Sequence, residues 1–281
     1  KPKYQREKDE YDKAIQNAEQ NIGQEGYLSQ AVGQSLIFKS EPRATVDIQL
    51  GSPNDFFIKK SSAEAKHGDI RTHINASLWD KAKDGTLNQE EMLKLDNDNK
   101  VTTSPYYLVN TSVGTTTTAV YSLKNSFFNG KKLGKLIVKY TPVLSSANDN
   151  RAVLAIHKDP TVTVWYGSAY DKKGQGNRLK QEYQYFYEDG TPVEFDSQHQ
   201  GILSFASRNN HGDYAYAEDF GDLSPNMNFI KITGSSIDKQ TDGRFYSLEN
   251  NNSYKGGAPY SSWDVDGNPN EFWGAGAATV S

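Results

Sequence analysis

The chain has 281 residues, a formal net charge of −4 and no cysteine. Its length is enough to bury a sizeable core, and the lack of cysteine excludes a disulfide framework, a thiolate metal site and a cysteine nucleophile. The acidic balance gives no overall attraction to polyanions but leaves room for a local basic patch. No apolar run approaches membrane-spanning length, so no membrane insertion is expected.

A helix is the first predicted element, over residues 1–25. Apolar residues recur there at spacings of seven, four, three and four, which is typical of a coiled-coil seam. They are Tyr4, Tyr11, Ile15, Ala18 and Ile22. Gly23 and Gly26 end the pattern, because glycine has a low helix propensity and offers a C-cap. A charged helix this short would be marginal alone, so we expect the end of a longer helical stalk. The N-terminus has no signal-peptide core, which suggests a fragment of a longer protein.

After Gly26 the hydrophobic pattern changes to a period of two, rich in β-branched and aromatic residues, as in β-strands. The predicted strands are residues 35–38, 44–50, 133–140, 152–157, 161–166, 182–187, 202–206 and 229–233. Turn dipeptides such as Asn129-Gly130 and Asp189-Gly190 separate them. Many strands without intervening helical patterns favour an antiparallel sandwich. We therefore expect one large all-β domain over residues 26–281.

Residues 77–95 interrupt this alternating hydrophobic pattern with a short helical one. Within them, residues 80–91 partly follow the twelve-residue calcium loop, with Asp80, Asp84, Gly85 and Glu91 at the expected positions. Ala82 stands where the loop needs a third ligand. The alternative is a plain loop leading into a helix, with Glu91 completing a capping box.

Basic residues cluster along the strand that follows Asn129-Gly130. Lys131, Lys132 and Lys135 belong to this strand, and Arg178 with Lys180 follow a glycine-rich loop. These five cations are candidates for binding a polyanion through its phosphate groups. The alternative is a solvated strand face that protects a sheet edge.

Aromatic residues mark a second candidate site at residues 165–170. Strand alternation puts Trp165 and Tyr166 on opposite faces, so at least one of them should lie in the core. Trp165 and Tyr170 could then line the mouth of a cleft, where aromatic rings stack on sugars.

Signals for an enzyme are thin. Glu194 and Asp196 lie on one strand face, as a sandwich glycosidase would need, but Gln198 and His199 stand where such enzymes carry a further glutamate. No nucleophile-elbow, zinc-protease or phosphate-loop motif occurs. We expect no catalytic residues.

Two tryptophans flank an oxygen-rich turn at residues 263–276. Aromatic faces stack on pyranose rings, while carboxylate and amide oxygens bind hydroxyl groups or a hard cation. The candidate ligand-binding residues here are Trp263, Trp273, Asp264 and Asn268. The candidate ligands of a structural calcium ion are Asp264, Asp266, Asn268, Asn270 and Glu271. The alternative is a solvated turn between strands whose tryptophans belong to the core.

Ordered blocks along the β part resemble the variable-region domain of the streptococcal antigen I/II adhesins and the related glucan-binding protein C-like domains. The blocks are residues 26–29, 34–42, 125–132, 230–237, 263–264 and 272–277. The resemblance implies a lectin-like β-supersandwich, non-enzymatic and displayed on the bacterial wall, with a cleft that holds a metal ion. Members of the family include host-glycoprotein adhesins, a glucan-binding protein and enterococcal aggregation substances that bind extracellular DNA and lipoteichoic acid.

We therefore expect a secreted, cell-wall-anchored surface adhesin that binds an extracellular glycan or host glycoprotein, with calcium as its cofactor. Such binding would support attachment, aggregation or biofilm formation. The alternative partner is a polyanion, extracellular DNA or lipoteichoic acid, held by the five cations. A glycoside hydrolase using Glu194 and Asp196 is the third hypothesis.

Overall fold

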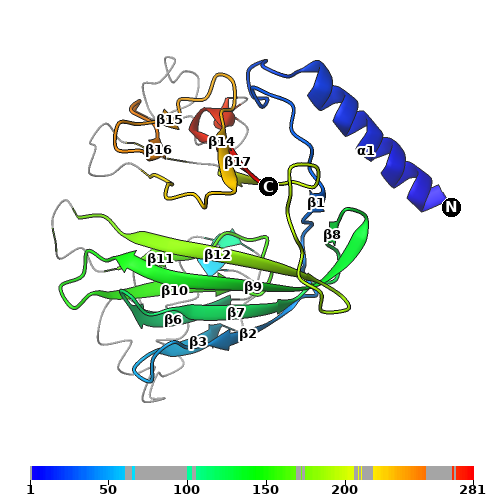
Figure 1. Ribbon diagram of the computed structural model, residues 1–281. Helices are drawn as coiled ribbons and strands as arrows, with labels where there is room; N and C mark the ends of the chain where they lie inside the picture. The colour runs from blue at the N-terminus through cyan, green and yellow to red at the C-terminus, as the bar shows by residue number, and fades with distance from the viewer. Residues whose placement is uncertain are drawn as a thin grey trace. The chain divides into compact units, whose positions relative to one another are not determined.

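The computed structural model describes residues 2–60, 65–66, 100–102, 106–168, 172, 175–205, 208, 210, 218–250, 268 and 270–281 (Figure 1). The chain divides into two compact units. One comprises residues 37–194, and the other comprises residues 1–36 and 195–281. The predicted insertion at residues 77–95 lies outside the described residues.

The predicted N-terminal helix is confirmed as α1, Pro2–Gln20. It is followed by Gly23 and Gly26, which both have positive φ and so suit the end of a helix. The side chains of Tyr4, Tyr11 and Ile15 lie outside the described part, so the seam stays a prediction. No helix in the described ranges combines the length and apolarity needed to cross a membrane.

The unit of residues 37–194 contains the two larger sheets, both antiparallel (Figure 1). The first has the order β1-β8-β9-β7-β2, with β12 paired to β9; its strands are β1 Leu36–Ile37, β2 Thr45–Gln49, β7 Thr117–Ser122, β8 Phe127–Phe128, β9 Lys131–Leu144 and β12 Arg178–Tyr187. The second has the order β11-β10-β6-β3, with β3 Phe56–Lys60, β6 Tyr106–Ser112, β10 Arg151–His157 and β11 Trp165–Gly167. A short pair joins β4 Ala65–Lys66 to β5 Lys100–Thr102.

Alternating side chains of the first sheet form one layer of the core. Tyr121 on β7 and Leu136 and Val138 on β9 are at most 1% exposed, whereas their strand neighbours lie on the opposite face. The Tyr121 hydroxyl donates to the His157 carbonyl at 3.1 Å, which joins the first sheet to β10 of the second. The all-β antiparallel prediction is therefore confirmed.

A β-bulge in β9 resets this alternation. Phe186 of β12 is paired with Lys135, but the next residue, Tyr187, is paired with Leu133, so Gly134 is the extra residue. A bulge leaves both Leu133 and Leu136 facing the core, although three positions separate them. Glycine is required here because a Cβ at position 134 would lie 2.8 Å from the Glu188 Cα.

A buried carboxylate fixes the chain that enters β8. Glu41 is fully buried and accepts hydrogen bonds from the Lys124 and Asn125 amides, at 2.7 and 2.8 Å, and from the Ser126 hydroxyl at 2.7 Å. Asp159 in turn accepts the Glu41 amide at 2.9 Å. These carboxylates satisfy amide groups of loops that no strand pairs.

The other unit contains a three-stranded sheet of order β13-β17-β14 and a two-stranded pair β15-β16. Their bounds are β13 Gly201–Phe205, β14 Met227–Ile230, β15 Asp238–Lys239, β16 Phe245–Tyr246 and β17 Gly276–Val280, with the short helix η3 Glu271–Gly274 before β17. Its core includes the rings of Phe220 and Phe245, which stack with their centroids 5.0 Å apart. Arg244 forms a two-pronged ion pair with Asp219 beside them.

Most predicted strands exist, but several observed ones were not predicted. Strand β11 begins only at Trp165, and β3, β6, β7 and β17 carry no strand prediction. The Gly276–Val280 strand is rich in glycine and alanine, so its pattern gives little β signal. The prediction of one β domain over residues 26–281 stays a prediction.

We predict that Glu41→Ala lowers the free energy of unfolding by about 3 kcal/mol, because it leaves three donors without an acceptor, two of them main-chain amides, inside the protein. Urea denaturation followed by circular dichroism measures this change. Asp47→Ala, at an exposed position of β2, is the control and should change stability by less than about 0.5 kcal/mol. A loss for Glu41→Ala no larger than the control's would contradict the role of this carboxylate.

Candidate functional site

The five candidate cations lie on the paired strands β9 and β12 or at their ends. Phe186 is opposite Lys135, Glu182 opposite Lys139, and Lys180 opposite Thr141. Because alternate residues share a face, Lys135, Lys139 and Lys180 lie on the face that points away from Tyr121 and Leu136. The structure therefore brings Lys135 and Lys180, two of the five predicted cations, to one surface together with Lys139, and we call this surface the outer face of β9 and β12.

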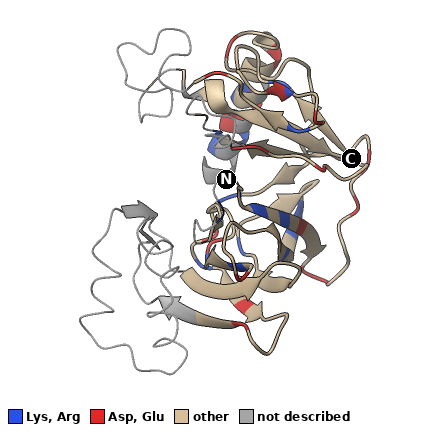
Figure 2. Ribbon diagram, turned by 90° about the vertical axis from the view of Figure 1, so that its left-hand side faces the viewer, with Lys and Arg blue, Asp and Glu red and all other residues tan. Residues whose placement is uncertain are grey.

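Carboxylates on β12 and in the turn after it balance part of the charge of these lysines and of their neighbours Lys131 and Lys132. Lys131 pairs with Asp189 at 2.8 Å, Lys132 with Glu188 at 2.8 Å, and Lys180 with Glu182 at 3.0 Å. The hydrogen bond from Lys131 lowers the pKa of Asp189. Figure 2 likewise shows Lys and Arg interspersed with Asp and Glu along the ribbon. The outer face is therefore a mixed surface rather than a uniformly basic one.

Two cations also contact aromatic rings. Lys131 Nζ lies 4.1 Å from the centroid of the Tyr187 ring, and Lys135 Nζ lies 4.0 Å from that of Phe186. Cation–π contacts of this length hold the ammonium groups over the strand.

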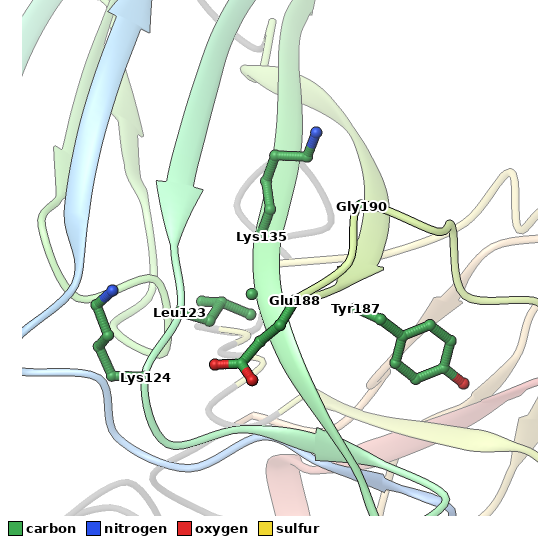
Figure 3. Close-up of a pocket in the computed structure, with 7 residues that line it drawn as sticks. Leu123, Lys124, Lys135, Tyr187, Glu188 and Gly190 are labelled. Atoms are coloured by element: carbon green, nitrogen blue, oxygen red, sulfur yellow. The ribbon is translucent and has the colours of Figure 1, made fainter.

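An open hollow of about 370 Å³ lies where β9 and β12 meet the turn after β7 (Figure 3). Its lining residues are Leu123, Lys124, Gly134, Lys135, Tyr187, Glu188 and Gly190. In Figure 3 the Glu188 carboxylate extends toward Leu123 and Lys124, while the Tyr187 ring points away from them. A second hollow of about 360 Å³ shares Gly134 and Lys135 and extends over Asp47 and Val120.

Together the two hollows form a shallow, continuous depression on the first sheet, lined by ammonium, carboxylate and hydroxyl groups. Such groups can bind the hydroxyls of a sugar or an anionic group, and the open shape suits a long polymer better than an enclosed small molecule. Sequence reasoning missed Lys124, Tyr187 and Glu188 as members of this surface. The Asp189-Gly190 turn placed Glu188 near a hairpin, but only the pairing register brings it beside Gly134.

The aromatic candidates that the structure describes are mainly core residues. Trp165 is partly buried and packs against the cluster of Tyr106, Leu108, Val153 and Ala155. Trp273 is only 6% exposed, so the expectation that its indole faces solvent is wrong. In η3 the main chain at this residue is also anchored, because the Trp273 carbonyl accepts the Ser236 amide and hydroxyl, both at 2.8 Å.

The candidate calcium ligands are described only in part. Asn268 is 5% exposed, and its Oδ1 accepts the Asn270 amide at 2.9 Å. This contact forms a local turn that leads into η3. Tyr170, Trp263, Asp264 and Asp266 lie outside the described residues, as does the Glu271 side chain. The part of the chain that is described contains no group of three acidic or histidine residues able to hold a metal.

Asp196, one of the two carboxylates of the glycosidase hypothesis, is held by local contacts. This carboxylate accepts hydrogen bonds from the His199 ring at 3.1 Å and from the Gln198 and His199 amides at 2.8 Å. These contacts, the ring contact first, lower the pKa of Asp196. A general acid in glycoside hydrolysis needs the opposite shift, so the shift argues against Asp196 as the acid and leaves Glu194 as the candidate for that role.

Comparison with protein families gives one match over nearly the whole chain. The family model described as glucan-binding protein C matches residues 19–281. Aggregation substance from Enterococcus faecalis is 25% identical over 255 residues, which is 85% of this chain and 18% of that protein. The chain therefore spans about a fifth of the length of this relative.

Two solved structures have a similar fold. The adhesin domain of PrgB from Enterococcus faecalis, bound to DNA, superposes with a TM-score of 0.63 at 21% identity, over 92% of this chain and 88% of that one. The glucan-binding protein C of Streptococcus mutans gives a TM-score of 0.57 at 22% identity, over 88% of this chain and 72% of that one.

We predict that Gly134→Ala lowers the free energy of unfolding by about 1–3 kcal/mol, because the new Cβ meets the Glu188 backbone, which cannot turn aside as a flexible side chain could. Thermal and urea denaturation measure the loss. Gly176→Ala is a matched control, since a Cβ there meets nothing within 4 Å. Equal stability of the two variants would contradict the close approach at the bulge.

Proposed function

The chain belongs to the glucan-binding protein C family, and we propose that it is an adhesin domain that binds an extracellular glycan. The observation that carries the proposal is the family match from residue 19 to residue 281. It is supported by the open depression on the first sheet, whose polar lining suits a long, hydroxyl-rich polymer. The family model and the relative are both named for binding or aggregation, and on that support we propose binding without catalysis.

We propose that the domain is displayed on a bacterial surface, where it supports attachment, aggregation or biofilm formation. The same site would also bind a glycan that is carried by a host glycoprotein. Open, shallow sites give weak single contacts, but many copies on one cell convert weak contacts into strong attachment. High affinity of one domain is not required for this role.

A polyanion such as extracellular DNA or lipoteichoic acid is the second candidate ligand. The observation that favours it is the set of cations on and around β9, together with the similar fold of an adhesin domain described as bound to DNA. Three of the lysines are already paired with carboxylates. A polyanion would have to replace these partners, and exposed pairs cost little to break.

We also propose calcium as a structural ion at residues 264–271. Support for it is the chemistry of the candidate set, in which carboxylate and amide oxygens are the ligands that calcium prefers. The ion would hold the chain before η3 and would take no part in chemistry.

We predict that the domain binds a neutral glucan and that this binding persists at high salt, because stacking and hydroxyl contacts are weakly screened. Binding to a glycan array and to duplex DNA, each at low and high salt, measures this. Glu188→Ala removes a carboxylate that lines the depression and is expected to weaken glucan binding while the protein stays folded. Glu249→Ala, at an exposed position in the other unit, is the control.

A different result selects the second ligand. If DNA binding is lost at modest salt, and is weakened further by Lys131→Ala, Lys132→Ala and Lys135→Ala together, DNA replaces the glycan as the proposed ligand. Affinity for nucleic acid falls steeply with salt concentration because the release of counterions then becomes less favourable.

We predict that added calcium raises the melting temperature and that a chelator lowers it, because an ion that binds only the folded state stabilises it. Differential scanning calorimetry in calcium and in chelator measures the shift. Asp264→Asn with Asp266→Asn should remove the calcium response. An unchanged melting temperature in the unaltered chain would rule out a structural calcium ion.

A further inference from the structure

In the part of the chain that the structure describes, strand β12 is paired with another strand on one side only. It pairs with β9 along Arg178–Tyr187. On its other side the strand folds back at its end, where the Tyr187 amide donates to the Thr191 carbonyl and the Val193 amide to that of Tyr185. Within the described ranges, no backbone hydrogen bond links residues 179–184 to any element besides β9.

The side chains of this segment are open to solvent. Residues 180–184 are all exposed, and the Lys180 and Glu182 side chains are 56% and 50% accessible. Tyr183 is 44% exposed, whereas Tyr185 on the same face of the strand is 4% exposed. This face of β12 is therefore buried at Tyr185 but open to solvent at Tyr183, two residues earlier.

The order of residues in the segment is self-complementary. If two copies of β12 paired antiparallel about Gln181, Lys180 of one copy would lie opposite Glu182 of the other, and Leu179 opposite Tyr183. Each of these pairs occurs twice because the arrangement has a twofold axis. Opposite charges and aliphatic–aromatic pairs both stabilise antiparallel strands.

Parallel pairing in the same register would place Lys180 against Lys180 and Glu182 against Glu182. Like charges directly opposite each other are destabilising, so the charge order selects the antiparallel arrangement. Charged residues usually protect an exposed edge from pairing. Here Lys180 and Glu182 disfavour pairing with most other strands, but they are complementary in charge to the same two residues of a second copy.

We propose that β12 is a homophilic contact, through which two copies of this chain join their first sheets edge to edge. The Lys180–Glu182 contact of 3.0 Å within one strand is replaced by two contacts between strands. The exposed Tyr183 ring becomes covered by Leu179 of the second copy. The contact is separate from the proposed glycan binding and does not depend on it.

Charge reversal tests the proposal with the full 281-residue chain. Sedimentation velocity over a wide concentration range is expected to show a reversible dimer. Lys180→Glu alone and Glu182→Lys alone should each weaken it roughly tenfold or more, because two opposite-charge pairs become like-charge pairs. An equimolar mixture of the two variants should form a heterodimer, and the double variant with both changes should dimerise like the original.

Lys239→Glu, at an exposed position of β15, makes the same change of net charge away from β12 and should leave dimerisation unaltered. A chain that stays monomeric at its highest soluble concentration would overturn the proposal. So would a dimer that survives both single reversals, as an association through α1 would, or single variants that fail to associate when mixed.

Discussion

The bulge at Gly134 is the constraint on which the first sheet depends. Because strand side chains alternate strictly, one extra residue in β9 changes which positions face the core on either side of it. Leu133 before the bulge and Leu136 after it are both fully buried, and Lys135 is left on the outer face. The same close approach of Gly134 to Glu188 forms the floor of the depression proposed for glycan binding.

Buried carboxylates play the corresponding role in the loops. Glu41 collects two amides and a hydroxyl from the turn between β7 and β8, and Asp159 holds the Glu41 amide. Each satisfies groups that strand pairing leaves over. The turn that carries Lys124 is thereby held in place, so one side of the depression rests on a carboxylate that never contacts solvent.

Charge on this unit is organised in pairs rather than in blocks. Lysines of β9 face carboxylates of the turn after β12, and cation–π contacts hold two ammonium groups over aromatic rings. Because its charges are paired, such a surface has a weak net electrostatic field and is suited to binding a neutral polymer. The charges along β12 likewise disfavour pairing with most other strands and are complementary to β12 of a second copy.

The sequence by itself determined the all-β antiparallel class, the N-terminal helix and the strands with clear alternation, such as β9 and β10, because hydrophobic period is a local property. Ordered sequence blocks also pointed to the family. Tertiary structure decided what lies beyond local pattern. Trp273 is buried although it follows an oxygen-rich turn, and Lys131 and Lys132 are paired with carboxylates more than fifty residues away. The depression and the edge position of β12 could not be predicted from the sequence pattern either. Both depend on the pairing register between distant strands, which no local signal encodes.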